Sequence, residues 1–344
     1  MKTLTIIIPT YNVEKYIGNC LSSLPLNRED LEVLVIIDGS IDQSADIAKH
    51  FERLNPKVVK VIEKENGHYG SCVNVGLSFA KGRYVKILDA DDSFSSNSDD
   101  YINFLHDTFA DVVLTDSESV DENGDSIFKL PLGLPTGQVL SLSDLLSLGL
   151  THLDHFNITY KTDLLRSLNY RQTEGLAYTD IEWDTIPLSI VQTISYLPII
   201  LYRYLRGRVG QSVGTTYRCN NQWMENKIIL GLASYYELNK GRMNKYNAQM
   251  VRSSIHVFAA RVYVHYLINY PGNLPISDLV AFDRDLLISS PEIYQGLLSD
   301  TYKRKFGTFY YIKDFRKRSS RKDWHFLYLD LCEGFRKALN TIHR

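Results

Sequence analysis

Three acidic side chains follow a short apolar stretch in YVKILDADDSF, residues 84–94. They are Asp89, Asp91 and Asp92, and only Ala90 separates the first two. Carboxylates at this spacing repel one another unless a cation lies among them. Mg²⁺ is typically bound by one or two carboxylates together with substrate phosphates. The spacing therefore predicts acids that hold a metal, which in turn holds a diphosphate; the alternative is that one acid only caps the next helix.

Expected strands and helices, which would position these acids, alternate along the first third of the chain. Short β-branched runs indicate strands at residues 4–8, 32–37, 58–62, 84–88 and 112–114. Amphipathic segments indicate helices at residues 13–24, 44–54 and 70–80. This alternation is typical of an α/β fold with a mostly parallel central sheet flanked by helices.

Polar motifs follow three of the expected strands: IIIPTYN, VIIDGSID and KILDADD. Ligands of open parallel sheets bind beyond the carboxyl ends of the strands, so the three motifs should converge at one edge. The first strand is followed by PTYNVEKY, which contains neither the glycine pattern of a dinucleotide site nor that of a P-loop. The sequence therefore gives little support to hydride transfer or to P-loop ATP hydrolysis.

Composition favours an enzyme of the reducing cytosol. With 344 residues and 44% hydrophobic composition, the chain can bury the core of a large domain with an appendage. No apolar window approaches the length of a membrane span, and no signal-peptide core is found. The cysteines have no CxxC spacing, so neither a zinc site nor a disulfide framework is indicated; they are Cys20, Cys72, Cys219 and Cys332.

Four segments resemble, in order and spacing, the motifs of family 2 inverting glycosyltransferases of the bacterial surface-polysaccharide type. They are TIIIPTYNVEKYIGNCLSSL, VLVIIDGSIDQSADIA, ENGHYGSCVNVGLSFAKGRYVKILDADD and GLAYTDIEWDTIPL. The resemblance implies a GT-A (Rossmann-like) domain at residues 1–214, with a nucleotide-sugar half to about 116 and an acceptor half from about 117. Long apolar-periodic stretches indicate a mainly helical region at 215–344.

The resemblance also implies a role for each matching residue. Asp180 would be the catalytic base, and Asp91 would ligate Mn²⁺ or Mg²⁺ as cofactor. Asp89 would face the ribose or the sugar, and Asp38 would receive the ring N–H of uracil. Other nucleotide-sugar contacts are expected from Pro9, Thr10, Tyr11, Asn74, Arg206, Arg208, Gln211 and Ser212.

Departures from the family pattern leave alternatives open. Ile37 precedes Asp38 where an acid is common, and Val73 precedes Asn74 where an arginine is common, so the donor sugar stays open. Glu182 lies two residues after Asp180 and could exchange roles with it.

Three aromatic side chains near these motifs have both a functional and a structural interpretation. His68 lies in a loop expected near the donor, or it is a surface hydrogen bonder. Trp183 either stacks on an acceptor sugar or packs its helix. His155 either approaches the acceptor or has a structural role.

The segment at 302–322 interleaves basic residues with aromatics. Basic clusters are attracted to anionic membranes, so this segment could bring the chain to a lipid-linked acceptor; a solvated helix face is the alternative, and nucleic acid is not expected as a partner. The chain is thus expected in the cytoplasm, either free or attached peripherally to the inner face of the cell membrane.

Function follows from the resemblance and the acids together. We expect a metal-dependent inverting hexosyltransferase that uses a UDP-sugar donor and a glycan or lipid-linked acceptor for cell-surface polysaccharide synthesis. The alternatives are a phosphotransferase or nucleotidyltransferase that uses the same acids, and a non-catalytic glycosyltransferase-like scaffold.

Overall fold

A computed structural model describes residues 2–208, 211, 214–304 and 307–319. The chain divides into two units, of which the first contains residues 1–211 and 240–254 and the second contains 212–239 and 255–344. The sequence predicts a boundary at residue 214, whereas residues 240–254 are grouped with the first unit. Helix α9, Lys245–Val264, therefore begins in the first unit and continues in the second.

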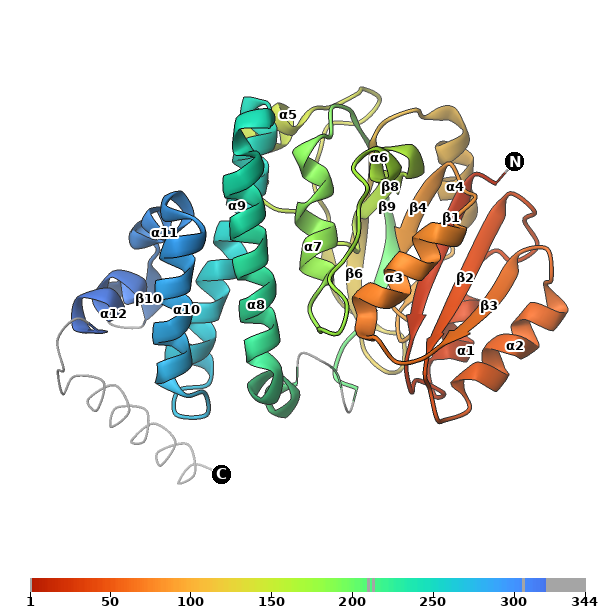
Figure 1. The fold of residues 1–344 in the computed structure, drawn as a ribbon. Helices are drawn as coiled ribbons and strands as arrows, with labels where there is room; N and C mark the ends of the chain where they lie inside the picture. The colour runs from red at the N-terminus through yellow and green to blue at the C-terminus, as the bar shows by residue number, and fades with distance from the viewer. Residues whose placement is uncertain (1, 209–210, 212–213, 305–306, 320–344) are drawn as a thin grey trace. The chain divides into compact units, whose positions relative to one another are not determined.

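A nine-stranded sheet forms the centre of the first unit, in the order β3-β2-β1-β4-β8-β6-β9-β5, with β7 paired to β6 (Figure 1). The strands β1, β2, β3 and β4 are parallel, and they are Leu4–Thr10, Leu31–Asp38, Val59–Lys64 and Tyr84–Ile87. The remaining strands include antiparallel pairs: β5 Ser93–Phe94, β6 Val112–Val120, β7 Ser126–Leu130, β8 Ile158–Lys161 and β9 Ile194–Leu205. The predicted α/β fold class is confirmed.

Helices cover both faces of β1 and β2, which explains why these two strands are mainly apolar and buried. Ile6 and Ile8 of β1 pack in the core with Ile17 of helix α1 (Ile17–Ser22). Ile7 points to the other face, against helix α3 (His68–Phe79). A Cβ on Gly76 of α3 would lie 2.6 Å from Ile7 Cγ2, so only glycine permits this approach.

The other helices of this unit are α2 (Ser44–Leu54), α4 (Ser98–Asp107), α5 (Leu142–Ser147), α6 (Thr162–Ser167) and α7 (Asp180–Thr185). The predicted helix at 13–24 is shorter than expected, because residues 13–16 form a turn in which the N–H of Tyr16 bonds to Val13 O at 2.9 Å. Ser44 does not cap α2 but accepts the N–H of Val13 at 2.9 Å, which ties the turn to that helix.

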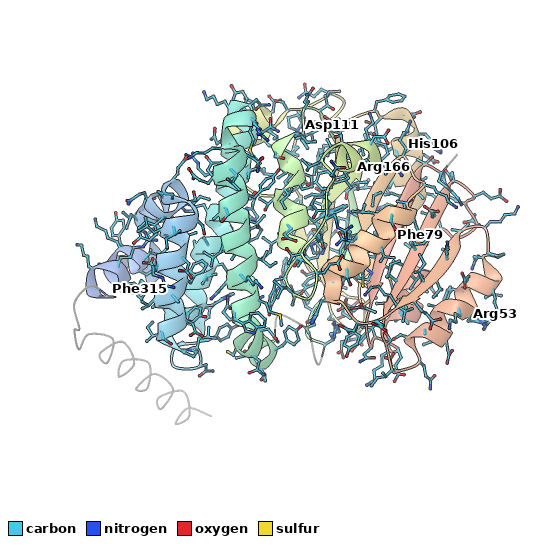
Figure 2. All side chains as sticks on the ribbon, in the orientation of Figure 1. Arg53, Phe79, His106, Asp111, Arg166 and Phe315 are labelled. Atoms are coloured by element: carbon cyan, nitrogen blue, oxygen red, sulfur yellow. The ribbon has the colours of Figure 1, made fainter. Side chains whose placement is uncertain are left out.

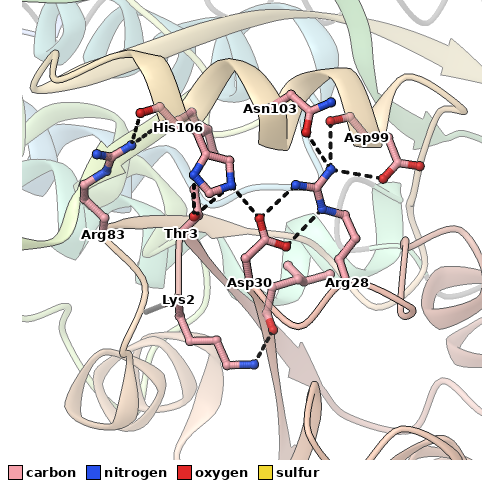
Figure 3. Close-up of polar contacts among 10 residues, drawn as sticks. Lys2, Thr3, Arg28, Asp30, Arg83, Asp99, Asn103 and His106 are labelled. Carbon is pink, nitrogen blue, oxygen red and sulfur yellow. Dashed lines mark hydrogen bonds and ion pairs between the residues drawn. The ribbon is translucent and has the colours of Figure 1, made fainter.

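Polar side chains secure the amino edge of the sheet, opposite to the predicted site (Figure 3). Asp30, just before β2, accepts from Arg28 Nη2 at 2.8 Å and lies 2.7 Å from Nε2 of His106 at the end of α4. Arg28 also donates to Asn103 Oδ1 at 2.8 Å. The guanidinium of Arg28 holds the pKa of Asp30 well below its usual range, although partial burial opposes this. This edge therefore stabilises the fold.

Helices dominate the second unit, as predicted for the C-terminal region. They are α8 (Thr215–Asn239), the later part of α9, α10 (Ile276–Ser289), α11 (Pro291–Gly296) and α12 (Tyr311–Ser319), with a hairpin of β10 (Tyr302–Arg304) and β11 (Gly307–Phe309). Buried Glu225 pairs with Arg218 at 2.8 Å and Arg261 at 2.6 Å, which satisfies its charge. Phe315 of α12 is buried against the ring of Tyr263, with centroids 6.0 Å apart (Figure 2).

No helix in the described part of the chain combines the length and the apolar character that crossing a bilayer requires. Within the basic segment 302–322, Arg316 is used internally: its Nε donates to Asp283 at 2.7 Å and its guanidinium lies 3.4 Å from the ring centroid of Tyr294. Residues 305–306 and 320–322 of that segment lie outside the described residues.

Candidate active site

The three predicted motifs meet at one edge of the sheet because β2, β1 and β4 are parallel neighbours. At the end of β1, Pro9 and Thr10 belong to the strand, and the hydroxyl of buried Thr10 donates to Ile8 O at 3.1 Å. Tyr11 follows with 53% of its surface exposed. Its ring is therefore available for stacking on a planar ligand.

Asp38 ends β2, where it lies beside Lys64 at the end of β3. Its Oδ1 accepts from Lys64 Nζ at 2.6 Å and from the N–H of Gly67 at 2.9 Å. The Asp38 side chain is only 4% exposed, so these bonds fix its orientation. The sequence analysis did not predict this contact of Lys64. Lys64 ends the strand next to β2, so the alignment of the two strand ends could have indicated it.

Asp89 is held by two aromatic side chains from distant parts of the sequence. Its Oδ1 accepts from the hydroxyl of Tyr69 in α3 at 2.8 Å, and its Oδ2 lies 3.3 Å from Nε2 of His155 before β8. Burial alone would raise the pKa of Asp89, but His155, Tyr69 and Arg208 lower it below the usual value. His155 thus contacts the acids directly, and sequence reasoning did not predict this contact.

Asp91 forms an ion pair with Arg208, which follows β9. Burial and the charge of Asp89 raise the pKa of Asp91 in spite of this arginine, so the carboxylate favours a nearby cation. Arg206 points elsewhere: its Nε donates to Ser119 Oγ at 3.1 Å, and its guanidinium lies 4.7 Å from the ring centroid of Phe128. Of the two predicted arginines, only Arg208 contacts the acidic motif.

Asp92 joins the acidic motif to β9 and does not cap the next helix. Its Oδ2 accepts from the hydroxyl of Tyr202 at 2.7 Å, and its Oδ1 accepts from the N–H of Leu205 at 2.7 Å. Burial, with the charges of Asp91 and Asp89, raises its pKa well above the ordinary value. Because Leu205 ends β9, Asp92 positions the turn that contains Arg208.

Gln211 stabilises the same turn, since its Oε1 accepts from the N–H of Gly207 at 3.0 Å and its Nε2 donates to Leu205 O. Ser212, which was predicted beside it, lies outside the described residues. The predicted diphosphate contact of Gln211 stays a prediction.

Asp180, the predicted base, is the first residue of α7. Burial lowers the pKa of His155, but the bond to Asp89 and the charges of Asp89 and Asp180 raise it above the usual value overall. Asp180 therefore acts electrostatically on the residue that holds Asp89. The charge of Asp180 also raises the pKa of Tyr69, the other side chain that contacts Asp89, so the predicted base acts on both partners of that acid.

Two residues near Asp180 differ from the expected contacts. Trp183 is fully buried, with its ring centroid 5.0 Å from that of Tyr160 and 5.8 Å from that of Tyr170. It has no exposed face for an acceptor sugar, so its role is packing. Glu182 is also buried, and both of its oxygens accept from Thr173, at 2.7 Å from N and 2.6 Å from Oγ1.

Asn74 contacts a protein loop rather than open space. Its Nδ2 donates to Gln172 O at 2.9 Å and to Glu174 Oε1 at 2.8 Å, and its Oδ1 accepts the N–H of Gln172 at 2.9 Å.

His68 begins α3 with φ of 64°, a value that few non-glycine residues adopt. Donor contacts from Asn74 and His68 remain predictions.

A metal ion at this edge would be bound by Asp91 together with the phosphates of a bound substrate. The described residues contain no group of three or more His, Cys, Asp or Glu side chains that could hold an ion. Asp89 and Asp92 already bind protein donors. The arrangement fits the mode in which one or two carboxylates and substrate phosphates share Mg²⁺.

Comparison with known proteins assigns the family. Residues 5–168 match the sequence profile of glycosyl transferase family 2. They belong to that family. The family 2 match includes Asp38, Asp89 and Asp91 but ends before Asp180 and the turn with Arg208.

Two curated relatives resemble this chain over limited ranges. The uncharacterized glycosyltransferase YibD of Escherichia coli is 29% identical over 217 residues, which are 58% of this chain and 60% of YibD. Poly(ribitol-phosphate) beta-N-acetylglucosaminyltransferase TarS of Staphylococcus aureus is 30% identical over 225 residues, 63% of this chain and 38% of TarS. The chain thus spans less than two thirds of either relative.

Solved structures confirm the GT-A fold. S. aureus TarS 1–349 superposes with a TM-score of 0.58 at 20% identity, covering 86% of this chain and 83% of the other. The same protein in complex with UDP-GlcNAc gives a TM-score of 0.51 at 20% identity, over 90% and 96%. Mannosyltransferase PcManGT of Pyrobaculum calidifontis, in complex with GDP-Man and Mn²⁺, gives 0.51 at 17% identity, over 85% and 82%.

Proposed function

We propose that this chain is a metal-dependent inverting glycosyltransferase that moves a hexose from a UDP-sugar to a glycan or lipid-linked hydroxyl. The observation that supports it most is the meeting of Asp38, Asp89 and Asp91 at the carboxyl ends of parallel strands within the family 2 match, with His155, which bonds to Asp89, under the influence of the charge of Asp180. These four acids correspond to the four tasks of base recognition, sugar contact, metal binding and proton removal.

Donor recognition falls to residues whose orientation is already fixed. Tyr11 offers an exposed ring to the uracil, and Asp38, oriented by Lys64 and Gly67, accepts the ring N–H of the base. Asp89, oriented by Tyr69 and His155, accepts from a hydroxyl of the ribose or the sugar. Preorganised acceptors lose little entropy on binding, which favours affinity. The UDP-GlcNAc complex of TarS supports uridine as the base.

Mn²⁺ or Mg²⁺ would bind to Asp91 together with the donor diphosphate. When bound, such an ion supplies Lewis-acid stabilisation of the charge on the leaving phosphate oxygens. Arg208, which pairs with Asp91 in this structure, would then bind a phosphate oxygen of the donor.

Asp180 would remove the proton of the acceptor hydroxyl as its oxygen attacks the anomeric carbon. Positioned general bases contribute about 10²- to 10⁴-fold to the rate. Attack from the face opposite the leaving UDP inverts the configuration at that carbon. An α-linked UDP-sugar would therefore give a β-linked product.

The acceptor class rests on the relatives and on the basic segment. TarS is named for a poly(ribitol-phosphate) acceptor, which supports a polysaccharide or other surface polymer. Exposed Lys313 and Lys317 of α12 would attract an anionic membrane at the cytoplasmic face. Sedimentation with anionic vesicles tests this part: equal binding by wild type and by Lys313→Gln/Lys317→Gln would contradict it.

Calorimetry with nucleotides tests the proposal without knowledge of the acceptor. Wild type is titrated with UDP, GDP, TDP and CDP, each with Mn²⁺ and with EDTA. We expect UDP to bind best, with Mn²⁺, and Asp91→Ala to lose the metal-dependent part of the affinity. Asp163→Asn, whose side chain is 80% exposed, is the matched control. Folded protein that binds no nucleotide would favour the scaffold. Release of pyrophosphate from UTP would favour a nucleotidyltransferase, and release of UMP from a UDP-sugar would favour a phosphotransferase.

A further inference from the structure

We propose that Thr173 and Glu182 form a clasp that positions Asp180, and that Glu182 is a positioning residue and not the general base. This inference rests on the proposed function. It removes the alternative in which Glu182 and Asp180 exchange roles. The clasp comprises the two hydrogen bonds from Thr173, at 2.7 Å from N and 2.6 Å from Oγ1, to the two oxygens of Glu182.

Glu182 is poorly placed to accept a proton from an acceptor. It is 7% exposed, and each of its oxygens already accepts from Thr173. Burial raises its pKa, although the Thr173 bonds oppose this. A general base must lie within hydrogen-bonding reach of the substrate proton, and this carboxylate lies against its own protein.

The helix that contains Asp180 needs support from outside. α7 has six residues, and its N-cap residue Thr179 makes no side-chain cap bond. Short helices have little stability of their own. The hydroxyl of Thr185 and the indole N–H of Trp183 are buried without a hydrogen-bond partner in the described structure. The position of α7 therefore depends on contacts such as the clasp.

On another side of α7, packing complements the clasp. The hydroxyl of Tyr160 in β8 donates to Trp183 O at 3.0 Å, and the Trp183 ring packs between Tyr160 and Tyr170. Glu182 and Trp183 are consecutive, so they point to different sides of the helix. Asp180 is thereby held by contacts on two sides of its helix.

The loop that contains Thr173 is itself bound to α3 near the donor residues. Asn74 bonds to both backbone groups of Gln172, and the N–H of Gly175 donates to Gly67 O at 2.9 Å. A Cβ on Gly70 would lie 2.1 Å from Thr173 O, so this glycine permits the contact. Gly67 also donates to Asp38. One network thus joins Asp38, α3, the loop and α7.

Loss of the clasp should affect transfer more than donor binding. A displacement of about 1 Å at a reacting group can cost about 10²-fold in rate. The donor contacts of Asp38 and Asp89 do not include Thr173 or Glu182. We therefore expect a lower kcat with nearly unchanged KM for the UDP-sugar.

Variants of both partners test the clasp. Thr173→Val removes the hydroxyl and keeps the shape, Thr173→Ser restores it, and Glu182→Gln keeps one of two acceptors. Thr115→Val is the matched control, because Thr115 is also buried but its hydroxyl has no hydrogen-bond partner among the described residues. We expect Thr173→Val and Glu182→Gln to lower kcat by roughly 10- to 100-fold. The kcat values of Thr173→Ser and Thr115→Val should stay near that of wild type. In all four variants the acid limb of the pH profile of kcat should keep its position.

The opposite pattern would overturn the inference. If Glu182 were the base, Glu182→Gln would abolish transfer, whereas Thr173→Val would leave kcat nearly unchanged and shift the acid limb. UDP affinity and thermal unfolding, measured on each variant, identify loss of folding. Absence of transfer by wild type would contradict the proposed function, while normal transfer by Thr173→Val would contradict only the clasp.

Discussion

The hydroxyl of Tyr202 bridges two of the three clustered acids: it donates to Asp92 Oδ2 at 2.7 Å and accepts the N–H of Asp89 at 3.2 Å. Tyr202 is fully buried on β9. The bridge fixes the acidic motif against β9, whose end leads to Arg208. Asp92 is thus a structural acid, and Asp91 is left as the acid beside the expected metal.

Replacing Tyr202 with phenylalanine should weaken the fold and the site together. Tyr202→Phe removes a donor from a buried carboxylate, which typically costs about 1–3 kcal/mol. We expect the urea midpoint to fall and Mn²⁺-dependent UDP binding to weaken in calorimetry. Tyr160→Phe, which removes a buried hydroxyl bonded only to a backbone oxygen in the described structure, is the comparison. Wild-type stability in Tyr202→Phe would show that the bridge contributes little.

The two arginines after β9 should differ in their effect on donor binding. Arg208 contacts Asp91, whereas Arg206 bonds to Ser119 and lies over Phe128. Hydrogen bonds to charged groups contribute about 1.5–3 kcal/mol, so Arg208→Gln should weaken UDP affinity about tenfold or more. Arg206→Gln should change it much less. Equal losses in calorimetry, with unchanged thermal unfolding, would mean that Arg206 also reaches the diphosphate.

The cluster at the amino edge predicts a pH-dependent contribution to stability. Arg28 depresses the pKa of Asp30 in the folded state, so the ionised carboxylate stabilises the fold above the unfolded pKa of about 3.9. This contribution is lost as pH falls below about 4 toward the folded pKa.

Asp30→Asn measures that contribution. The substitution should lower the free energy of unfolding by about 1–3 kcal/mol near neutral pH, and the difference from wild type should shrink in denaturation curves below pH 4. A difference that does not depend on pH would show that the charge of Asp30 is not responsible. UDP affinity, measured at neutral pH, should be unchanged because this edge lies opposite the site.

Much of the first unit could be predicted because local sequence determines it. β1 and β2 are mainly apolar, since parallel strands covered on both faces bury almost every side chain. The end of each run marks the edge where the polar motifs meet, so Asp38, Asp89 and Asp91 were found together. Their partners Lys64, Tyr69 and Tyr202 were not, because strand pairing and packing bring them there from distant positions.

The acceptor half was harder to predict. β6, β8 and β9 do not follow one another in the sheet in chain order, and their pairings are mixed in direction. This strand order cannot be predicted from the local sequence of each strand. The role of Trp183 could not be predicted from the sequence either, because its position after Asp180 is compatible with stacking on a sugar and with packing. Its contacts with Tyr160 and Tyr170 show that it packs.

The central claim is that Asp180 removes the acceptor proton, and Asp180→Asn tests it most directly. UDP affinity with Mn²⁺ and the rate of UDP release from the UDP-sugar that wild type consumes are measured on the same preparations, with Asp163→Asn as control. We predict nearly unchanged UDP affinity and a loss of roughly 10²- to 10⁴-fold in rate. A rate in Asp180→Asn equal to that of wild type would contradict the assignment of the base.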